Sequence, residues 1–321
     1  MNSFEKISFY AKQKIPFIFI IDYDLLKPVV IPIAEVNPDE ILYNFNGVKN
    51  YTPVEVPTSG NYILNKKPVS IERYTEAFNY IQTNQSDGNS YLTNLTFPTQ
   101  IEINYTLKEI FHISSARYKL WYLDQFVVFS PEIFLTIKDR KISSYPMKGT
   151  IDASINDAEN IILNDEKESA EHLTIVDLIR NDLSRVSKNV SVEKYRYIDK
   201  IQTAGKNLLQ VSSEITGILN PDYRDNLGEI LKKLLPAGSI TGAPKHKTVE
   251  IIKSAEKYDR GYYCGICGIF DGIDLDSGVM IRYIEKDNGN YIFKSGGGIT
   301  VYSELQSEYR EMIDKVNIPV N

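Results

Sequence analysis

The chain has 321 residues, of which 42% are hydrophobic and 24% are charged, and its formal net charge is -6. This composition is typical of a globular protein with ample length for a large core. The acidic balance, without a long basic run, argues against a nucleic-acid partner. An anionic ligand would therefore need local cations, either a metal or specific Arg and Lys side chains.

The chain begins with an apolar run from Ile15 that predicts a core strand. This run has only about eight residues, which is too short for a membrane span, and no small-residue cleavage site accompanies it. We therefore expect a cytoplasmic protein with no membrane association. The segment 44–67 is rich in Asn, Pro, Gly and Thr and marks a soft boundary. We expect residues 1–60 to form a short N-terminal strand region packed on a catalytic domain of residues 61–321.

Hydrophobic periodicity separates the expected strands from the expected helices. Alternating patterns predict strands at 16–21, 28–33, 88–97, 119–129, 133–138, 262–271, 277–286 and 291–295, with 119–129 and 133–138 paired around a turn at Ser130–Pro131. Helical spacing predicts helices at 71–82, 166–187, 227–235, 244–257 and 303–316. Because strands and helices do not alternate regularly, the sequence favours an α+β fold with large, mostly antiparallel sheets packed with helices.

The predicted helix 166–187 begins with two glutamates on its apolar face. Glu168 and Glu171 share this face with Ile175 and Leu178. A buried carboxylate needs a partner such as a cation. For Glu168 there is an alternative, because Asp165 and Glu168 also fit a capping box at the helix start.

The last predicted helix repeats this arrangement with Glu308 and Glu311. Ser303 is expected to cap the helix, with Gln306 in the reciprocal position. Two glutamate pairs on two helices could meet around one hard cation such as Mg²⁺, which takes one or two carboxylates. Such pairs are also common on solvated helix faces.

Lys148 lies in the segment Pro146-Met-Lys-Gly-Thr150, after a predicted strand. Gly149 permits unusual backbone angles, so a tight turn here could approach a ligand closely. An amine whose pKa is lowered near a cation or in a dry pocket becomes a nucleophile. The ordinary alternative for this segment alone is a solvent-exposed turn lysine.

Two glycine-rich segments and one arginine could hold an anion. The segment 238–245 (GSITGAPK) leads into a helix, and the exposed amides of a helix start suit a carboxylate. The segment 295–299 (SGGGI) offers similar backbone donors, although both segments could simply be tight turns. Arg282 is a charge in a mostly apolar strand, which a carboxylate partner would explain, unless it is a surface residue of an edge strand.

The two cysteines, Cys264 and Cys267, do not indicate a redox or zinc site. They lie in a strand pattern, in which residues three apart point to opposite faces. No second cysteine pair or histidine spacing completes a zinc site.

Six ordered segments together resemble the chorismate-utilising enzymes: anthranilate and aminodeoxychorismate synthase component I, and the isochorismate and salicylate synthases. The segments are PMKGT, KESAEHLTIVDLIRNDLSRV, GSITGAPK, YYCGICGIF, VMIRY, and GGGI followed by SEYREMIDK. They extend from about Tyr91 to the C-terminus. The resemblance implies the chorismate-binding enzyme fold.

The resemblance also implies roles for residues in these segments. Glu171 and Glu311 resemble the Mg²⁺ ligands of the family, with Glu168 and Glu308 supporting them. The remaining positions resemble those that bind substrate: Tyr263 and Arg282 for a carboxylate, and Thr241, Gly296, Gly297 and Gly298 for the ring and side chain.

Lys148 discriminates among the activities of the family. The motif of aminodeoxychorismate synthases is P-I-K-G-T, whereas that of anthranilate synthases is P-I-A-G-T. The resemblance therefore implies that Lys148 attacks C2 of chorismate as the C4 hydroxyl leaves, and that ammonia then adds at C4 and expels the lysine. The expected product is 4-amino-4-deoxychorismate, for folate synthesis. No glutaminase nucleophile segment is recognisable, so ammonia is expected from a separate glutamine amidotransferase subunit.

Two positions depart from the family pattern. Leu92 stands where isochorismate and salicylate synthases have a water-activating lysine and many aminating members have Gln. Gln210 stands where many relatives have a histidine that assists proton transfer, which counts against anthranilate synthase. The alternatives are an anthranilate or isochorismate synthase, or a non-catalytic chorismate-binding paralogue.

Overall fold

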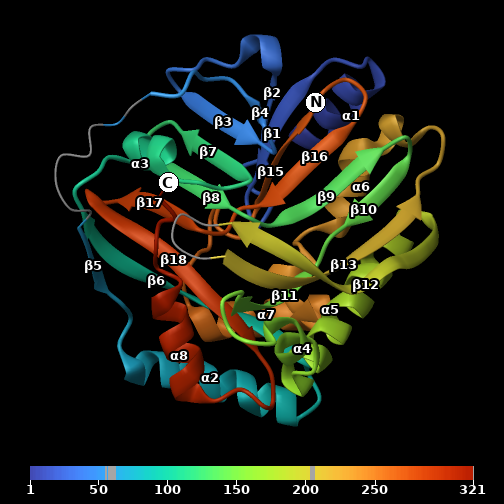
Figure 1. The fold of residues 1–321 in the computed structure, drawn as a ribbon. Coiled ribbons are helices and arrows are strands. Elements are labelled where there is room, and N and C mark those ends of the chain that lie inside the picture. The colour runs from blue at the N-terminus through green and yellow to red at the C-terminus, as the bar shows by residue number, and fades with distance from the viewer. Residues whose placement is uncertain (55, 57–62, 203–206, 321) are drawn as a thin grey trace.

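The computed structural model describes every residue except 55, 57–62, 203–206 and 321. The described strands form two sheets, and every pairing within them is antiparallel. Helices cover parts of these sheets (Figure 1). The predicted α+β class with antiparallel sheets is therefore confirmed. In the described part of the chain, no helix is long and apolar enough to cross a membrane.

The first sheet contains nine described strands. They are β1 (Phe17–Ile21), β2 (Val29–Pro32), β9 (Ile133–Lys138), β10 (Lys141–Ser144), β11 (Met147–Asp152), β12 (Lys188–Gln202), β13 (Asn207–Ile218), β15 (Ile266–Phe270) and β16 (Leu275–Val279). Their order is β11-β13-β10-β9-β16-β15-β1-β2, and β12 also pairs with β13.

The second sheet also contains nine described strands. They are β3 (Ile41–Phe45), β4 (Val48–Lys49), β5 (Leu64–Lys67), β6 (Leu92–Ile103), β7 (Tyr118–Tyr122), β8 (Phe126–Ser130), β14 (Gly242–Ala243), β17 (Tyr283–Asp287) and β18 (Asn290–Ile299). Their order is β14-β6-β18-β17-β8-β7-β3-β4, and β5 pairs with β6. Residues 1–60 thus contribute strands to both sheets, and the division of the chain at residue 60 stays a prediction.

The α-helices are α1 (Ser3–Lys12), α2 (Ile71–Ser86), α3 (Leu107–Ile113), α4 (Ala158–Leu163), α5 (Glu166–Ser184), α6 (Leu227–Leu234), α7 (Lys245–Glu256) and α8 (Leu305–Asp314). The sequence predicts α2 and α5 to α8 within a few residues of these bounds. It misses α1, α3 and α4, although Asn2 and Glu5 form a capping box at the start of α1. Helix α5 packs on β11, β12 and β13, whereas α8 packs on β18 of the other sheet.

Two of the crossings between the sheets lie next to each other. Strand β8 of the second sheet leads into β9 of the first, and β16 of the first leads into β17 of the second. The crossings are bonded to each other: the amide of Phe129 donates to the carbonyl of Arg282 at 3.1 Å, and that of Val279 to the carbonyl of Glu132 at 3.1 Å. Glu132 and Arg282 therefore lie where the sheets meet.

These crossings correct two strand predictions. The predicted pairing of 119–129 with 133–138 is wrong, because 119–129 is itself the β7–β8 hairpin and 133–138 belongs to the other sheet. The single strand predicted at 277–286 is two strands, separated by Arg282 at a φ of 53°. Local alternation of apolar residues detects an extended chain but does not report which sheet it joins.

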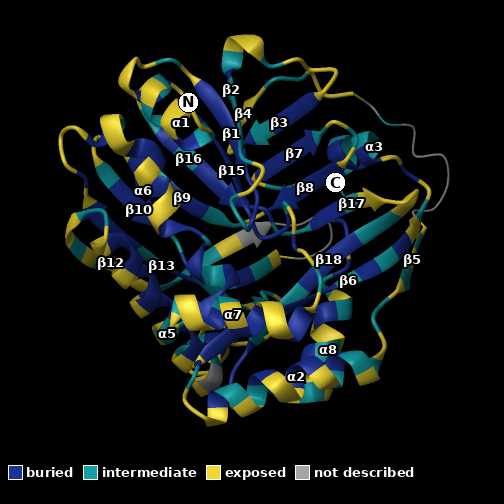
Figure 2. Ribbon diagram, turned by 180° about the vertical axis from the view of Figure 1, so that it is seen from behind, coloured by how far each residue is buried: buried dark blue, intermediate teal, exposed yellow. Residues whose placement is uncertain are grey.

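The largest apolar core lies between the two sheets. It includes Phe19 of β1, Ile137 of β9 and Leu120 of β7, all at most 1% exposed. Figure 2 shows the strands mainly buried, while the helices present exposed outer faces. The core holds the two sheets together, so side chains from both can converge on one cleft.

Candidate active site

A cleft of about 850 Å³ brings together elements from both sheets. Strand β11 of the first sheet and helix α5, which packs on that sheet, line one side of the cleft. Strand β18 of the second sheet and helix α8, which packs on β18, also line it. The cleft is lined by most of the residues that the sequence selects: Lys148, Glu168, Glu171, Arg282, Gly298, Glu308 and Glu311. Gln210 lines it as well.

Lys148 lies inside strand β11 rather than in a turn. It pairs with Val211 of β13, and the register shifts at Gly149, where the backbone has a φ of 76°. This conformation favours glycine. A β-carbon at Gly149 would also lie only 3.2 Å from Oε2 of Glu168. Gly149 therefore lies in a strand bulge beside the carboxylate of Glu168.

The amine of Lys148 forms an ion pair with Glu171, whose side chain is 5% exposed. Burial by itself lowers the pKa of Lys148, but Glu171 and then Glu168 and Glu311 raise it, so the pKa lies above its usual value. This arrangement therefore lacks the lowered pKa that would make the amine a nucleophile. Lys148 is held as an ammonium, and it becomes a nucleophile only after the ion pair opens and a proton leaves Nζ.

The first turn of α5 is capped by Asp165, whose Oδ1 accepts from the amide of Glu168 at 2.8 Å. The predicted cap is confirmed in this half of the box. The side chain of Glu168 nevertheless lines the cleft. Glu168 thus combines a capped backbone with a carboxylate in the candidate site.

Helix α8 begins differently from the prediction. Its N-cap is Glu304 without a side-chain cap bond, whereas Ser303 donates to Oε1 of Glu308 at 2.7 Å. Ser303 therefore holds a carboxylate of the cleft instead of capping the helix. The second glutamate of this helix, Glu311, forms an ion pair with Lys315 at 2.6 Å.

The carboxylates of α8 converge over Gly297. Oε2 of Glu308 and Oε1 of Glu311 both lie 3.5 Å from the position that a β-carbon of Gly297 would take. Among the described residues, no group of three or more His, Cys, Asp or Glu side chains is placed to hold a metal. Mg²⁺ needs only one or two carboxylates together with water and ligand oxygens. The chemistry of the four glutamates fits such an ion.

Gly296, Gly297 and Gly298 lie inside strand β18, paired with β6, so the alternative of a tight turn is wrong for this segment. The amides opposite them point away from β18: that of Thr96 donates to Glu256, and that of Asn94 donates to the carbonyl of Thr241, each at 2.8 Å. The antiparallel alternation then directs the amides of Gly296 and Gly298 away from β6. The predicted backbone donors are thus available at a strand edge.

Gly298 also lies between two side chains that matter to the predicted chemistry. A β-carbon there would lie 3.1 Å from Cδ1 of Leu92 and 3.3 Å from Nζ of Lys148. The absence of a side chain at this position keeps the space beside the amine open. Leu92 makes the wall on this side apolar.

The remaining predicted substrate residues differ in their access to the cleft. Arg282 lines it, donates to the carbonyl of Lys315 at 2.5 Å, and has its pKa lowered by burial. Tyr263 is buried and interacts electrostatically with Arg282. Thr241 is fully buried and donates to the carbonyl of Ala237 at 2.9 Å. It is not among the residues that line the cleft.

Neither Lys315 nor Glu132 is selected from the sequence, and Glu132 lies outside the residues that line the cleft. Lys315 lines the cleft and donates to the carbonyl of Gly296 at 2.9 Å. Glu132 accepts from the hydroxyl of Ser239 and has a pKa raised by burial, although Lys315 and Lys148 oppose the shift. The i,i+4 spacing from Glu311 could have identified Lys315, whereas Glu132 is placed only by the sheet crossing.

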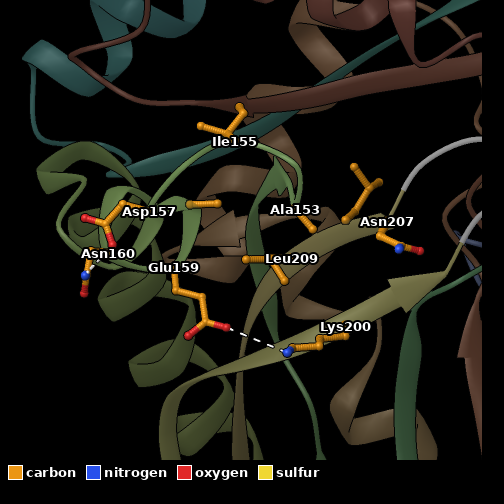
Figure 3. A pocket seen from close by; sticks show the side chains of 10 residues that line it. Ala153, Ile155, Asp157, Glu159, Asn160, Lys200, Asn207 and Leu209 are labelled. Carbon is orange, nitrogen blue, oxygen red and sulfur yellow. Dashed lines mark hydrogen bonds and ion pairs between the residues drawn. The ribbon is translucent and has the colours of Figure 1, made fainter.

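A second hollow, of about 500 Å³, lies beyond the end of β11 and contains none of the predicted site residues. Figure 3 shows Ile155, Glu159 and Lys200 around it, with Nζ of Lys200 4.0 Å from Oε1 of Glu159. Its charged side chains are largely exposed. We therefore take the 850 Å³ cleft as the candidate active site.

Comparison with known proteins gives a match over most of the chain. Residues 35–321 match the family described as chorismate binding enzyme. The chain is 49% identical over 316 residues to an "Uncharacterized PabA-like protein" of Haemophilus influenzae, covering 98% of this chain and 96% of that protein. It is 30% identical over 277 residues to aminodeoxychorismate synthase component 1 of Bacillus subtilis, covering 80% of this chain and 56% of that protein.

The fold is also that of a solved structure. Anthranilate synthase component I from Streptococcus pneumoniae superposes with a TM-score of 0.67 at 24% identity, covering 82% of this chain and 62% of that chain. The similarity confirms the fold predicted from the ordered sequence segments.

Proposed function

We propose, because this chain belongs to the chorismate-binding enzyme family, that it converts chorismate and ammonia to 4-amino-4-deoxychorismate. It would then be component I of an aminodeoxychorismate synthase and supply folate synthesis. The observation that carries this proposal is the position of Lys148. Its amine lies in the cleft, between the carboxylate of Glu171 and the space in front of Gly298.

The proposed reaction has two substitutions. Neutral Nζ of Lys148 forms a bond to C2 of chorismate, both double bonds of the ring diene shift, and the C4 oxygen leaves with a proton as water. Ammonia then forms a bond to C4, both double bonds shift back, and the bond from C2 to Nζ breaks. A covalent intermediate replaces one difficult step by two easier ones, and the lysine is regenerated.

The residues around Lys148 support this chemistry. Ion pairing with Glu171 keeps the amine in the cleft until substrate arrives. Burial raises the pKa of Glu132, which interacts electrostatically with Lys148. Arg282 and Lys315 supply positive charge for the carboxylates of chorismate.

Glu171 and Glu311 would hold Mg²⁺, with Glu168 and Glu308 supporting them. The ion would neutralise the ring carboxylate and stabilise charge that develops during substitution. Without it, six acidic side chains line the cleft: Glu168, Glu171, Glu304, Glu308, Glu311 and Asp314. They would repel a dianionic substrate.

Ammonia is proposed to come from a separate glutamine amidotransferase subunit. The sequence has no recognisable glutaminase nucleophile segment, so the chain would accept free ammonia when the partner is absent. The protein should therefore be active in vitro with ammonium salts alone.

Product analysis tests the proposal. The purified chain is incubated with chorismate, Mg²⁺ and ¹⁵N-ammonium, and the products are separated and identified by mass spectrometry. We expect 4-amino-4-deoxychorismate carrying one ¹⁵N atom. Anthranilate or isochorismate as the main product would contradict the proposal, as would an inert wild-type protein.

A further inference from the structure

Four polar residues fasten the first turns of α5 to the edge of the first sheet. Ser169 and His172 lie on α5, Arg196 on β12 and Ser213 on β13. Nε2 of His172 lies 2.7 Å from Oγ of Ser213, and Nη1 of Arg196 donates to Oγ of Ser169 at 3.0 Å. We call these four residues the polar clamp. His172 and Ser213 are at most 1% exposed, so water does not compete for their bond.

The hydrogen bonds of the clamp fix its geometry. The backbone amide of Arg196 donates to Oγ of Ser213 at 2.9 Å, and the same Oγ shares a second hydrogen bond with Nε2 of His172. Its ring is thereby held in one orientation.

Arg196 reaches the helix because β12 is irregular at this point. Its backbone has a φ of 48°, and the register with β13 shifts between Lys194 and Tyr197. Besides Ser169, its guanidinium donates to the carbonyl of Ile162 near the end of α4, at 3.3 Å. The bulged strand thus binds both α4 and α5, on either side of the corner between them.

The two clamp residues of α5 each follow a glutamate of the cleft in the sequence. Glu168 immediately precedes Ser169, and Glu171 immediately precedes His172. Neighbouring residues of an α-helix project about 100° apart, because one turn has about 3.6 residues. Fastening Ser169 and His172 to the sheet therefore fixes the rotation of α5 and directs both carboxylates toward Lys148.

We propose that the polar clamp is a positioning device for Glu168 and Glu171. None of its members is assigned contact with substrate, and its effect is exerted through the two carboxylates. The part of this inference that concerns Mg²⁺ rests on the proposed function. Residues that orient metal ligands from behind typically change metal affinity or activity about 10- to 100-fold when they are mutated.

The test compares three clamp variants with a matched control. His172→Leu and Ser213→Ala remove the bond, whereas His172→Gln keeps a polar group near the position of Nε2. His246→Leu is the control, because the His246 side chain is 95% exposed on α7. Two quantities are measured: amide hydrogen exchange of residues 166–173, and Mg²⁺ affinity by calorimetric titration.

We expect faster exchange in residues 166–173 and about 10- to 100-fold weaker Mg²⁺ binding in His172→Leu and Ser213→Ala. His172→Gln should recover most of both losses, and His246→Leu should match the wild type. Wild-type exchange in both clamp-breaking variants would overturn the proposal, and so would failure of His172→Gln to recover. Hydrogen exchange tests the positioning role of the polar clamp even if the wild type binds no Mg²⁺ or makes no product. Those two outcomes would count against the proposed function alone.

Discussion

The two acidic helices have the same glutamate spacing but place their carboxylates in different surroundings. On α5, Glu171 is 5% exposed and pairs with Lys148 of a distant strand. On α8, the side chain of Glu311 is 51% exposed and pairs with Lys315 on the following turn. The α5 pair depends on tertiary packing, whereas the α8 pair is local. The proposed nucleophile, Lys148, is therefore held by the α5 side, and we propose that α8 contributes binding charge.

The largest expected effect is the difference in activity between variants of the two lysines, Lys148 and Lys315. Lys148→Ala removes the proposed nucleophile, so ammonium-dependent turnover should fall on the order of 10³-fold or more, as when other catalytic nucleophiles are removed. Lys315→Ala removes a charged binding group, which is worth roughly 1.5–3 kcal/mol, or about 10- to 100-fold, mainly in KM for chorismate. Steady-state kinetics with ammonium measures both effects. Equal losses in kcat for the two variants would contradict the assignment of Lys148 as the nucleophile and Lys315 as a binding group.

The next comparison concerns Mg²⁺ affinity. Glu171→Gln should weaken Mg²⁺ binding about tenfold more than Glu311→Gln, because charges interact more strongly in the buried, less polar surroundings of Glu171. Calorimetric titration of the two variants measures this difference. A larger loss for Glu311→Gln would make α8 the dominant half of the metal site.

The α5 side also contains a buried histidine that responds to pH. Burial, then Arg196 and Lys148, lowers the pKa of His172 to about 4, compared with about 6.5 in the unfolded chain. As pH falls below about 6.5, the unfolded state takes up the proton first, so the contribution of His172 to stability should fall by roughly 2 kcal/mol between pH 8 and pH 5.

Urea unfolding of the wild type and His172→Gln at both pH values checks this sign. The wild type should lose more stability on acidification than the variant does. Equal losses in the two proteins would show that His172 titrates normally.

The smallest expected effect is the difference between substitutions at the starts of α5 and α8. Asp165→Ala removes a cap of α5 and should cost about 1 kcal/mol of unfolding free energy, with little change in Mg²⁺ affinity. Ser303→Ala removes the hydroxyl that donates to Glu308, so it should change Mg²⁺ affinity more than Asp165→Ala does. Chemical unfolding and metal titration of both variants measure the two effects, and the reverse pattern would make Ser303 the cap.

The features predictable from sequence are those set by neighbouring residues. The apolar stripes locate α5 and α8, and Asp165 marks the start of α5. The prediction that Ser303 caps α8 is wrong, because its bond to Glu308 competes with capping, and sequence spacing does not rank the two. Arg282 was placed in a continuous strand, because the crossing between sheets is a long-range feature.

Contacts that depend on those crossings could not be predicted. Glu132 follows an ordinary strand, and only the meeting of the two sheets places it within electrostatic reach of Lys148 and Lys315. The ion pair of Lys148 with Glu171 joins residues 23 positions apart, so the raised pKa of the amine was not foreseeable from a glycine-flanked lysine. Only the fold shows which neighbouring charges act on Lys148 and on Glu132.

The central claim is that Lys148 is the nucleophile that commits this cleft to amination. The most direct measurement is peptide mass spectrometry of the protein after incubation with chorismate and Mg²⁺ in the absence of ammonium. We expect a mass increase equal to chorismate less one water, located on Lys148 and removed when ammonium is added. An adduct on another residue, or conversion of chorismate to isochorismate with Lys148 unmodified, would contradict this account.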